Sequence, residues 1–161
     1  MKKISAGILP YRFRDNTLEV FLVHMGGPFW AKKDLGAWSI AKGELDGPED
    51  PLDAAKREFK EETGFALDEG LQFIALDPLK QSTGKVIRAY VTEADFDPGK
   101  ISSNFFSLEW PLRSGKYQEF PEVDRAEWFP ISIARDKIIK GQVGFLDQLE
   151  RLKQSRSSLP F

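Results

Sequence analysis

One helix is specified at both ends by its own sequence, and it constrains the fold more than any other segment. Residues 51–63, PLDAAKREFKEET, follow Asp50, a favourable N-cap, and begin with Pro51, which suits the first helical position. Gly64 comes directly after them, and glycine readily takes the left-handed conformation that ends a helix. The sequence therefore predicts a helix over residues 51–63.

The predicted helix has two distinct faces. Its apolar positions recur at spacings of three and four, which is the pattern of a helix that buries one side. They are Leu52, Ala55, Phe59 and Thr63. Glu58, Glu61 and Glu62 stand at i, i+3 and i+4 and therefore share another side. Like charges at this spacing destabilise a helix by about 0.2–0.5 kcal/mol per pair, so the acidic side carries a cost.

A bound cation would balance this acidic side. Three carboxylates within one turn are hard oxygen ligands, which suit Mg²⁺ or Mn²⁺ better than zinc. Mg²⁺ usually takes only a few protein oxygens and keeps waters or substrate phosphates in its other positions. Arg57 lies beside these acids and could orient one of them through paired hydrogen bonds. The alternative is an ordinary exposed acidic helix, which is the usual meaning of a charge run.

The remaining patterns predict a single α+β domain over residues 1–155, followed by a flexible tail over residues 156–161. A strand hairpin with the turn sequence RDNT opens the chain, and the last predicted element is an amphipathic helix. The expected strands are residues 4–13, 18–25, 37–43, 71–82, 85–94, 105–110 and 125–131, and the further helices are residues 132–139 and 144–154.

Composition excludes several classes of function. The 161 residues include no cysteine, which removes disulfides, thiolate nucleophiles and cysteine-ligated metals. A net charge of −2 provides no overall basic field for nucleic acid or anionic lipid. The apolar run near the N-terminus is too short for a signal peptide, and no stretch is long enough to span a membrane. We expect a cytoplasmic protein without a nucleic-acid or membrane partner, and a homodimer is compatible with these features.

A longer pattern surrounds the acidic helix. It consists of Gly43, five residues, Glu49, seven residues, and then Arg57-Glu58-Phe59-x-Glu61-Glu62-x-Gly64-Phe65. This resembles the signature of the Nudix hydrolase family, G-x5-E-x7-R-E-U-x-E-E-x-G-U, in which U is a bulky apolar residue. Every fixed position matches over 23 residues, with phenylalanine in place of the usual aliphatic residue at both apolar positions.

The resemblance implies an α/β/α sandwich around a mixed sheet and hydrolysis of a nucleoside diphosphate linked to another group, assisted by Mg²⁺. Glu58, Glu61 and Glu62 would then bind the metal. Arg57 and Glu49 would organise these ligands, and Glu58, Glu61 and Arg57 would also serve catalysis. Gly43 would bring the loop backbone close, with its carbonyl as a candidate metal ligand, and Gly64 would stop the helix.

The general base that takes a proton from water is open at this point. Glu61 or Glu62 could serve while the other acids hold metal. Many Nudix enzymes also carry a metal-binding or basic glutamate shortly before a tryptophan on a late strand, and Glu122 precedes Trp128 by six positions. We therefore favour Glu122 as base or additional ligand, with Glu119 and Glu127 as competitors.

Substrate binding requires cations for phosphate and flat apolar groups for a base. Lys42 directly precedes Gly43, and Lys32 lies in the preceding loop. Trp30 and Tyr117 are candidates for base stacking, although packing is the more usual role of an aromatic residue. Lys33, Arg113, Lys116, Phe29 and Trp38 are further candidates of the same two kinds. His24 is assigned no role.

The segment AKGELDGPED is similar to the form PKGHxExGE of the dinucleoside polyphosphate hydrolase branch, with Ala41 for proline and Glu44 for histidine. This favours that branch, or a nucleoside triphosphate pyrophosphohydrolase. The alternative function is a non-catalytic Nudix module that binds or senses nucleotides. Such modules typically lose the signature acids, and this chain keeps all of them.

Overall fold

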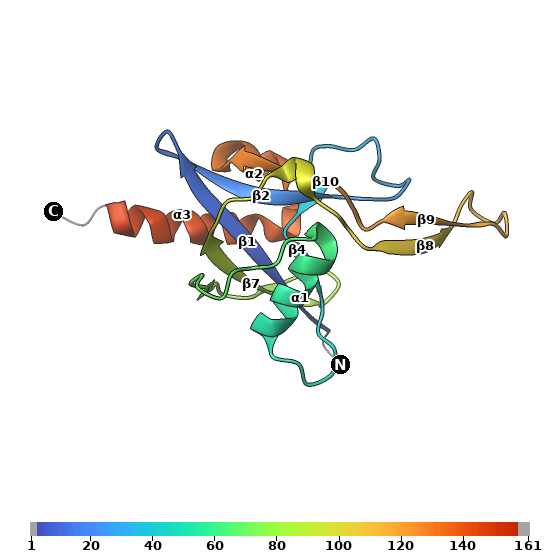
Figure 1. The fold of residues 1–161 in the computed structure, drawn as a ribbon, viewed down its shortest axis with the longest axis horizontal. Helices are drawn as coiled ribbons and strands as arrows, with labels where there is room; N and C mark the ends of the chain where they lie inside the picture. Colours follow the sequence, from blue (N-terminus) through green and yellow to red (C-terminus); the bar gives the residue numbers. More distant parts are fainter. Residues whose placement is uncertain (1–2, 158–161) are drawn as a thin grey trace.

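A long antiparallel hairpin runs through the middle of the molecule (Figure 1). The computed structural model describes residues 3–157, and the hairpin consists of β1 (Ile4–Arg14) and β2 (Thr17–Met25). Asp15 and Asn16 form its turn with positive φ angles of 51° and 65°. Aspartate and asparagine tolerate this left-handed backbone, which suits a two-residue hairpin turn. The turn predicted from RDNT is confirmed.

Within residues 3–157, eight strands form one mixed sheet whose main order is β10-β2-β1-β7-β5. β1 pairs in parallel with β7 and antiparallel with β2 and β4, and β2 pairs antiparallel with β10 and β3. The other strands are β3 (Trp38–Ser39), β4 (Ala41–Glu44), β5 (Ile74–Ala75), β6 (Leu79–Lys80), β7 (Val86–Glu93) and β10 (Val123–Pro130). The strand predicted over residues 71–82 is thus two separate two-residue strands at one edge.

Helices cover both faces of the sheet (Figure 1). On one face, α1 (Pro51–Thr63) buries Ala54, Ala55 and Phe59 in a cluster with residues of β1, β2 and β10. On the other face, α2 (Ile131–Lys137) and α3 (Val143–Ser157) contribute to a second cluster around Trp38. Two short 3₁₀ turns are η1 (Pro98–Lys100) and η2 (Lys140–Gln142). A mixed sheet between helices is the expected fold class.

A two-stranded ribbon extends away from the body (Figure 1). It consists of β8 (Phe105–Glu109) and β9 (Tyr117–Pro121), paired antiparallel. The sequence predicted the first strand but not the second. β9 is short, its first three residues are exposed, and it ends in proline, so it lacks the apolar alternation that identifies a strand.

Local signals set the helix bounds well. The predicted helix over residues 51–63 coincides with α1, and the two later helices are also present. The buried stripe of α1 differs from prediction, because Leu52 is only half-buried whereas Ala54 and Glu62 are buried. Of the predicted tail, residues 156–157 end α3 and residues 158–161 lie outside the described part of the chain. No described helix is long and apolar enough to cross a membrane.

Candidate active site

The caps predicted for α1 hold the helix in place. The Asp50 side chain accepts hydrogen bonds from the backbone N–H groups of Leu52 and Asp53, at 3.1 and 3.2 Å. Gly64 has a φ of 81° and its N–H donates to the Lys60 carbonyl at 2.7 Å. The helix is therefore fixed at both ends, and its acids occupy defined positions.

Arg57 links the loop before α1 to the acids on the helix. Its Nε and Nη2 donate to the two carboxylate oxygens of Glu49, each at 3.0 Å, and its Nη1 donates to Glu58 at 2.8 Å. These hydrogen bonds from Arg57 lower the pKa of Glu49. A guanidinium that serves two carboxylates at once fixes both, so the organising role expected for Arg57 and Glu49 has a geometric basis.

Gly43 leaves room for the carboxylate of Glu58. A Cβ atom on Gly43 would lie 2.0 Å from Cδ of Glu58, which no side chain could tolerate. Gly43 belongs to β4 and pairs with Ala6 on β1, so its backbone cannot easily move aside. A glycine at this position thus lets a helix carboxylate lie directly against the backbone of the sheet.

Glu62 is the most unusual acid of the group. Its exposed fraction is 7%, and its Oε2 has no hydrogen-bond partner among the described residues. Burial, together with the negative charges of Glu58 and Glu122, raises the pKa of Glu62 to about 9, although Lys42 opposes this rise through its charge and its backbone N–H. An orphaned buried carboxylate oxygen costs free energy that only a cation, a proton or a donor can recover.

Glu122 joins these acids from a distant part of the sequence. The Asn104 N–H donates to the Glu61 carbonyl at 2.8 Å, and the Glu122 N–H donates to the Asn104 carbonyl at 2.9 Å. These backbone bonds connect the end of α1 to the segment before β10. Burial and the negative charge of Glu61 raise the pKa of Glu122, and burial likewise raises that of Glu58.

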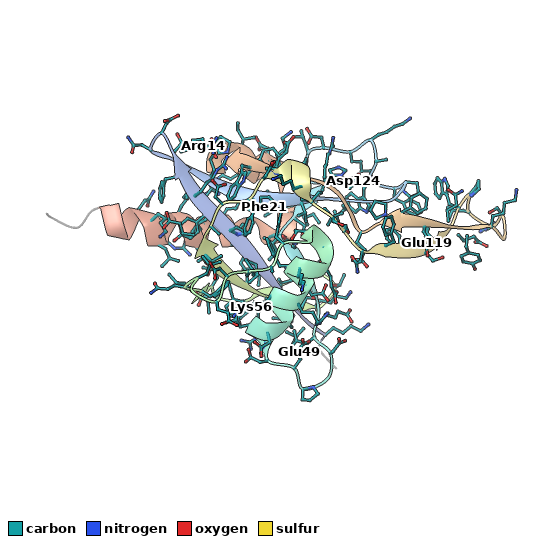
Figure 2. The ribbon with its side chains drawn as sticks, in the orientation of Figure 1. Arg14, Phe21, Glu49, Lys56, Glu119 and Asp124 are labelled. Atoms are coloured by element: carbon teal, nitrogen blue, oxygen red, sulfur yellow. The ribbon has the colours of Figure 1, made fainter. Side chains whose placement is uncertain are left out.

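The competing acids lie elsewhere. Glu119 is exposed on β9 of the ribbon, opposite Ser107 of β8 (Figure 2). Glu127 lines a different cavity of about 600 Å³, together with Arg12 and Trp128. Of the three late glutamates that the sequence offered, only Glu122 faces the acids of α1.

A cavity of about 260 Å³ opens beside Glu62 and Glu122. Trp30 and Lys42 line it, as does Phe106 of β8. Lys42 also lines an adjacent cavity of about 340 Å³. Phe106 was not identified from the sequence, because its place at the cavity depends on how the ribbon joins the body.

Two predicted substrate residues lie outside this cavity. Lys32 is exposed in the same loop as Trp30 but does not line the cavity. Tyr117 is 69% exposed and pairs with Glu109 at the outer end of the ribbon. Their roles in substrate binding stay predictions that the geometry does not support.

The donor set at this site fits a hard divalent cation. Among residues 3–157, no three acidic or histidine side chains are already arranged together as ligands of a metal ion. Glu58 instead accepts a hydrogen bond from Arg57. The three helix acids also differ, because Glu62 is buried, Glu58 lies against Gly43 and Glu61 is more exposed. However, Glu58, Glu61, Glu62 and Glu122 form a group of four interacting carboxylates, and no sulfur or imidazole ligand stands among them. The Glu62 oxygen without a partner and the absence of a side chain on Gly43 leave this group open to a cation that prefers oxygen ligands.

Comparisons with known proteins provide a family and a fold for the chain. A family model described as NUDIX domain matches residues 1–149. Among solved structures, a C. elegans Ap4A hydrolase is 19% identical, with a TM-score of 0.66 and coverage of 95% of this chain and 98% of that chain. A mutT/nudix family protein from Listeria innocua is 15% identical, with a TM-score of 0.63 and coverage of 98% of both chains.

The NUDIX domain of Shewanella oneidensis NrtR, complexed with ADP ribose, is 16% identical, with a TM-score of 0.58 and coverage of 99% of this chain and 90% of that chain. A comparison with curated protein sequences found no significant match. At these identities the solved structures establish the fold, and the family model provides the assignment.

Proposed function

Because the chain belongs to the Nudix family, we propose that it is a Mg²⁺-dependent hydrolase that cleaves the pyrophosphate linkage of a nucleoside diphosphate derivative. The observation that carries this proposal is the group of four carboxylates, Glu58, Glu61, Glu62 and Glu122, beside a cavity that also contains Lys42 and Trp30. Family membership confirms the expected enzyme class. The cation and the substrate are the finer part of the proposal.

The residues of this chain have distinct roles in the proposed reaction. A bound divalent cation would neutralise diphosphate charge and lower the pKa of a nearby water. Glu58, Glu61 and Glu62 would hold it, with the Gly43 carbonyl as a further ligand. Mn²⁺ has similar ligand preferences and is expected to substitute for Mg²⁺.

A proton must leave the water that attacks phosphorus. The oxygen of that water forms the new bond, its proton passes to a carboxylate, and the bond from phosphorus to the leaving oxygen breaks. We propose Glu122 as the acceptor, because its raised pKa makes it a stronger base than an ordinary glutamate. Glu61 is the alternative acceptor from within α1.

The substrate side of the cavity combines charge and aromatic surface. Lys42 would contact phosphate, and Trp30 would stack on a nucleobase. The similarity of AKGELDGPED to the dinucleoside polyphosphate branch and the fold shared with an Ap4A hydrolase support a dinucleoside polyphosphate or a nucleoside triphosphate as the substrate class.

The alternative is a non-catalytic module that binds a nucleotide. The support for this alternative is the fold shared with the NrtR domain, which was solved in complex with ADP ribose. The complete set of acids favours catalysis, because binding alone does not need them. A cytoplasmic location, a homodimer and the lack of a nucleic-acid partner stay predictions.

A hydrolysis screen tests the proposal. The purified protein would be assayed with Mg²⁺ or Mn²⁺ against nucleoside triphosphates, dinucleoside polyphosphates, sugar nucleotides and ADP-ribose, with products identified. We expect Mg²⁺-dependent turnover of one class, its loss in Glu61→Gln, and a decrease of about 10²-fold or more in Glu122→Gln. Glu119→Gln is the matched control and should keep full activity.

Three results would contradict parts of the proposal. Full activity in Glu61→Gln would reject the catalytic assignment of the acidic helix. A wild-type rate in Glu122→Gln would return the role of base to the acids of α1. Turnover of no nucleotide, combined with a nucleotide-dependent rise in Tm, would favour the binding module.

A further inference from the structure

His24 lies fully buried at the end of β2, between two segments that border the cavity. Its exposed fraction is 0%. Its Nε2 is 2.6 Å from the carbonyl oxygen of Lys33, and its Nδ1 is 2.8 Å from Oδ1 of Asp124. The ring also packs edge-on against Trp38, with ring centroids 5.0 Å apart. A single imidazole thus connects the loop of residues 26–37 to β10.

The two partners of His24 demand a particular side chain. A carbonyl oxygen can only accept, so the bond to Lys33 requires an N–H at Nε2. The second ring nitrogen, Nδ1, shares its hydrogen bond with Oδ1 of Asp124. Few side chains offer two polar atoms that point in diverging directions from a compact ring, and an aliphatic side chain at position 24 would bond to neither partner.

The loop that His24 holds includes Trp30. The Lys33 N–H donates to the Trp30 carbonyl at 2.9 Å, so residues 30–33 form a turn. The carbonyl that bonds to His24 belongs to Lys33, the last residue of this turn. The loop has no regular secondary structure between residues 26 and 37. Its later part is anchored separately, by an ion pair between Asp34 and Lys137 and by the Gly36 N–H donating to the Asp136 carbonyl.

The other partner lies beside Glu122. Asp124 occupies the irregular position of β10, between Val123 and Arg125, where the pairing with β2 shifts register. Figure 2 places Asp124 near the end of the sheet from which the ribbon extends. Val123 and Glu122 both line the cavity. His24 therefore connects the wall that contains Trp30 to the wall that contains Glu122.

We propose that His24 is a positioning residue that sets the width of the substrate cavity by holding the Trp30 loop against β10. This rests on the proposed function, which makes Trp30 a contact for the nucleobase. Glu122 keeps two other backbone bonds, to Gly26 and Asn104, so its wall stays in place without His24. Trp30 packs against the core and Phe29 against Trp110, and the hydrogen bond from His24 to the Lys33 carbonyl ties the turn of residues 30–33 to the sheet. Loss of the imidazole therefore weakens substrate binding and leaves the chemical step nearly unchanged.

The test compares His24→Phe, His24→Gln and Lys153→Met. His24→Phe keeps a flat buried ring but removes both ring nitrogens, whereas His24→Gln keeps one amide donor for the Lys33 carbonyl. Lys153→Met is the matched control, because Lys153 is also buried, and its Nζ donates to the Tyr11 hydroxyl at 2.7 Å away from the lining of the cavity. KM, kcat and amide hydrogen exchange in residues 26–37 are measured for each.

We expect His24→Phe to raise KM about tenfold with kcat within about twofold, because the loosened loop costs binding energy of the order of a single hydrogen bond. Hydrogen exchange in residues 26–37 should accelerate, and His24→Gln should recover part of both losses. Lys153→Met should lower stability without changing KM or exchange in the loop. If His24→Phe does not fold, His24→Gln and Asp124→Ala are used in its place. Each should show a smaller rise in KM than expected for His24→Phe and faster hydrogen exchange in residues 26–37 than the wild-type protein.

The proposal is overturned if a folded His24 variant shows wild-type KM and wild-type loop exchange, or if kcat falls while KM is unchanged. Its failure can be separated from failure of the proposed function. If the wild-type protein hydrolyses no nucleotide, loop exchange alone decides. Faster exchange in the His24 variants and not in Lys153→Met supports the positioning role, and equal exchange rejects it.

Discussion

Glu62 is the residue at which the fold and the proposed chemistry conflict most. A carboxylate in this buried position, near two other acids, favours its protonated form. A folding sequence would ordinarily place an apolar residue here. The chain keeps glutamate with an unpaired oxygen, which is the kind of local cost that functional sites carry.

The raised pKa of Glu62 predicts how stability depends on pH. In the unfolded chain Glu62 titrates near its ordinary value of 4.5, and in the folded protein near about 9, so the folded state holds an extra proton between these values. The free energy of unfolding should therefore fall as pH rises from about 5 to about 9 in the absence of divalent cations. Urea unfolding in EDTA across this range measures it.

Glu62→Gln is the decisive variant for this prediction. The amide carries no charge at any pH in this range, so the downward slope should become shallower than in the wild-type protein. Glu119→Gln, on the exposed ribbon, should keep the wild-type slope. Equal slopes in all three proteins would mean that Glu62 is not buried as the structure has it.

At the scale of elements, α1 gathers most of the site into one short segment. Its caps fix where the helix begins and ends, Arg57 fixes its relation to the preceding loop, and Gly43 lets it approach β4 closely. The acids of the proposed cation site are thus positioned largely by local interactions. Because the caps lie next to the helix in the sequence, the bounds of α1 could be predicted without the structure.

The N-cap should make a measurable contribution to this element. Asp50→Ala removes the acceptor for two backbone N–H groups of the first turn and should lower the free energy of unfolding by about 1 kcal/mol. Asp50→Ser retains a capping oxygen and should lose much less. Urea unfolding of the three proteins checks this, and equal losses in both variants would show that the charge matters more than the cap.

At the scale of the whole molecule, the site joins parts of the chain that are far apart in sequence. α1, Asn104 and Glu122 are connected by backbone hydrogen bonds, and the loop of residues 26–37 meets the same region through Gly26 and His24. A cation that binds the acids therefore stabilises contacts between several elements. The effect should appear in global unfolding.

Mg²⁺ should raise the Tm of the protein. Binding to the folded state alone adds about 1.4 kcal/mol at ten times Kd, which corresponds to an increase of roughly 3–6 °C for a domain of this size. The increase should be larger at pH 8 than at pH 6, because Glu58, Glu62 and Glu122 all have raised pKa values and must lose protons to bind.

Differential scanning calorimetry with and without millimolar Mg²⁺ measures this effect. Glu62→Gln should show a much smaller increase, and Glu119→Gln should show the full increase. A Tm that does not respond to Mg²⁺ in the wild-type protein would mean that the four carboxylates do not form a cation site.

The sequence alone determined α1, the first hairpin and the family. Caps, turn residues and apolar spacing are local, so residues 50–64 and the turn at Asp15 and Asn16 specify their own backbone. Spacing along a single helix likewise placed Glu58, Glu61 and Glu62 together. No contact with a distant part of the chain was needed for these predictions.

Tertiary structure decided the rest. The sequence favoured Glu122 over Glu119 and Glu127, but only strand pairing and the bonds through Asn104 bring it beside α1. The same packing buries Glu62, puts Phe106 at the cavity, moves Tyr117 away from it, and gives His24 its two partners. Periodicity in the sequence reveals which face of an element is apolar. Which elements become its neighbours depends on pairing between strands that are far apart in the sequence.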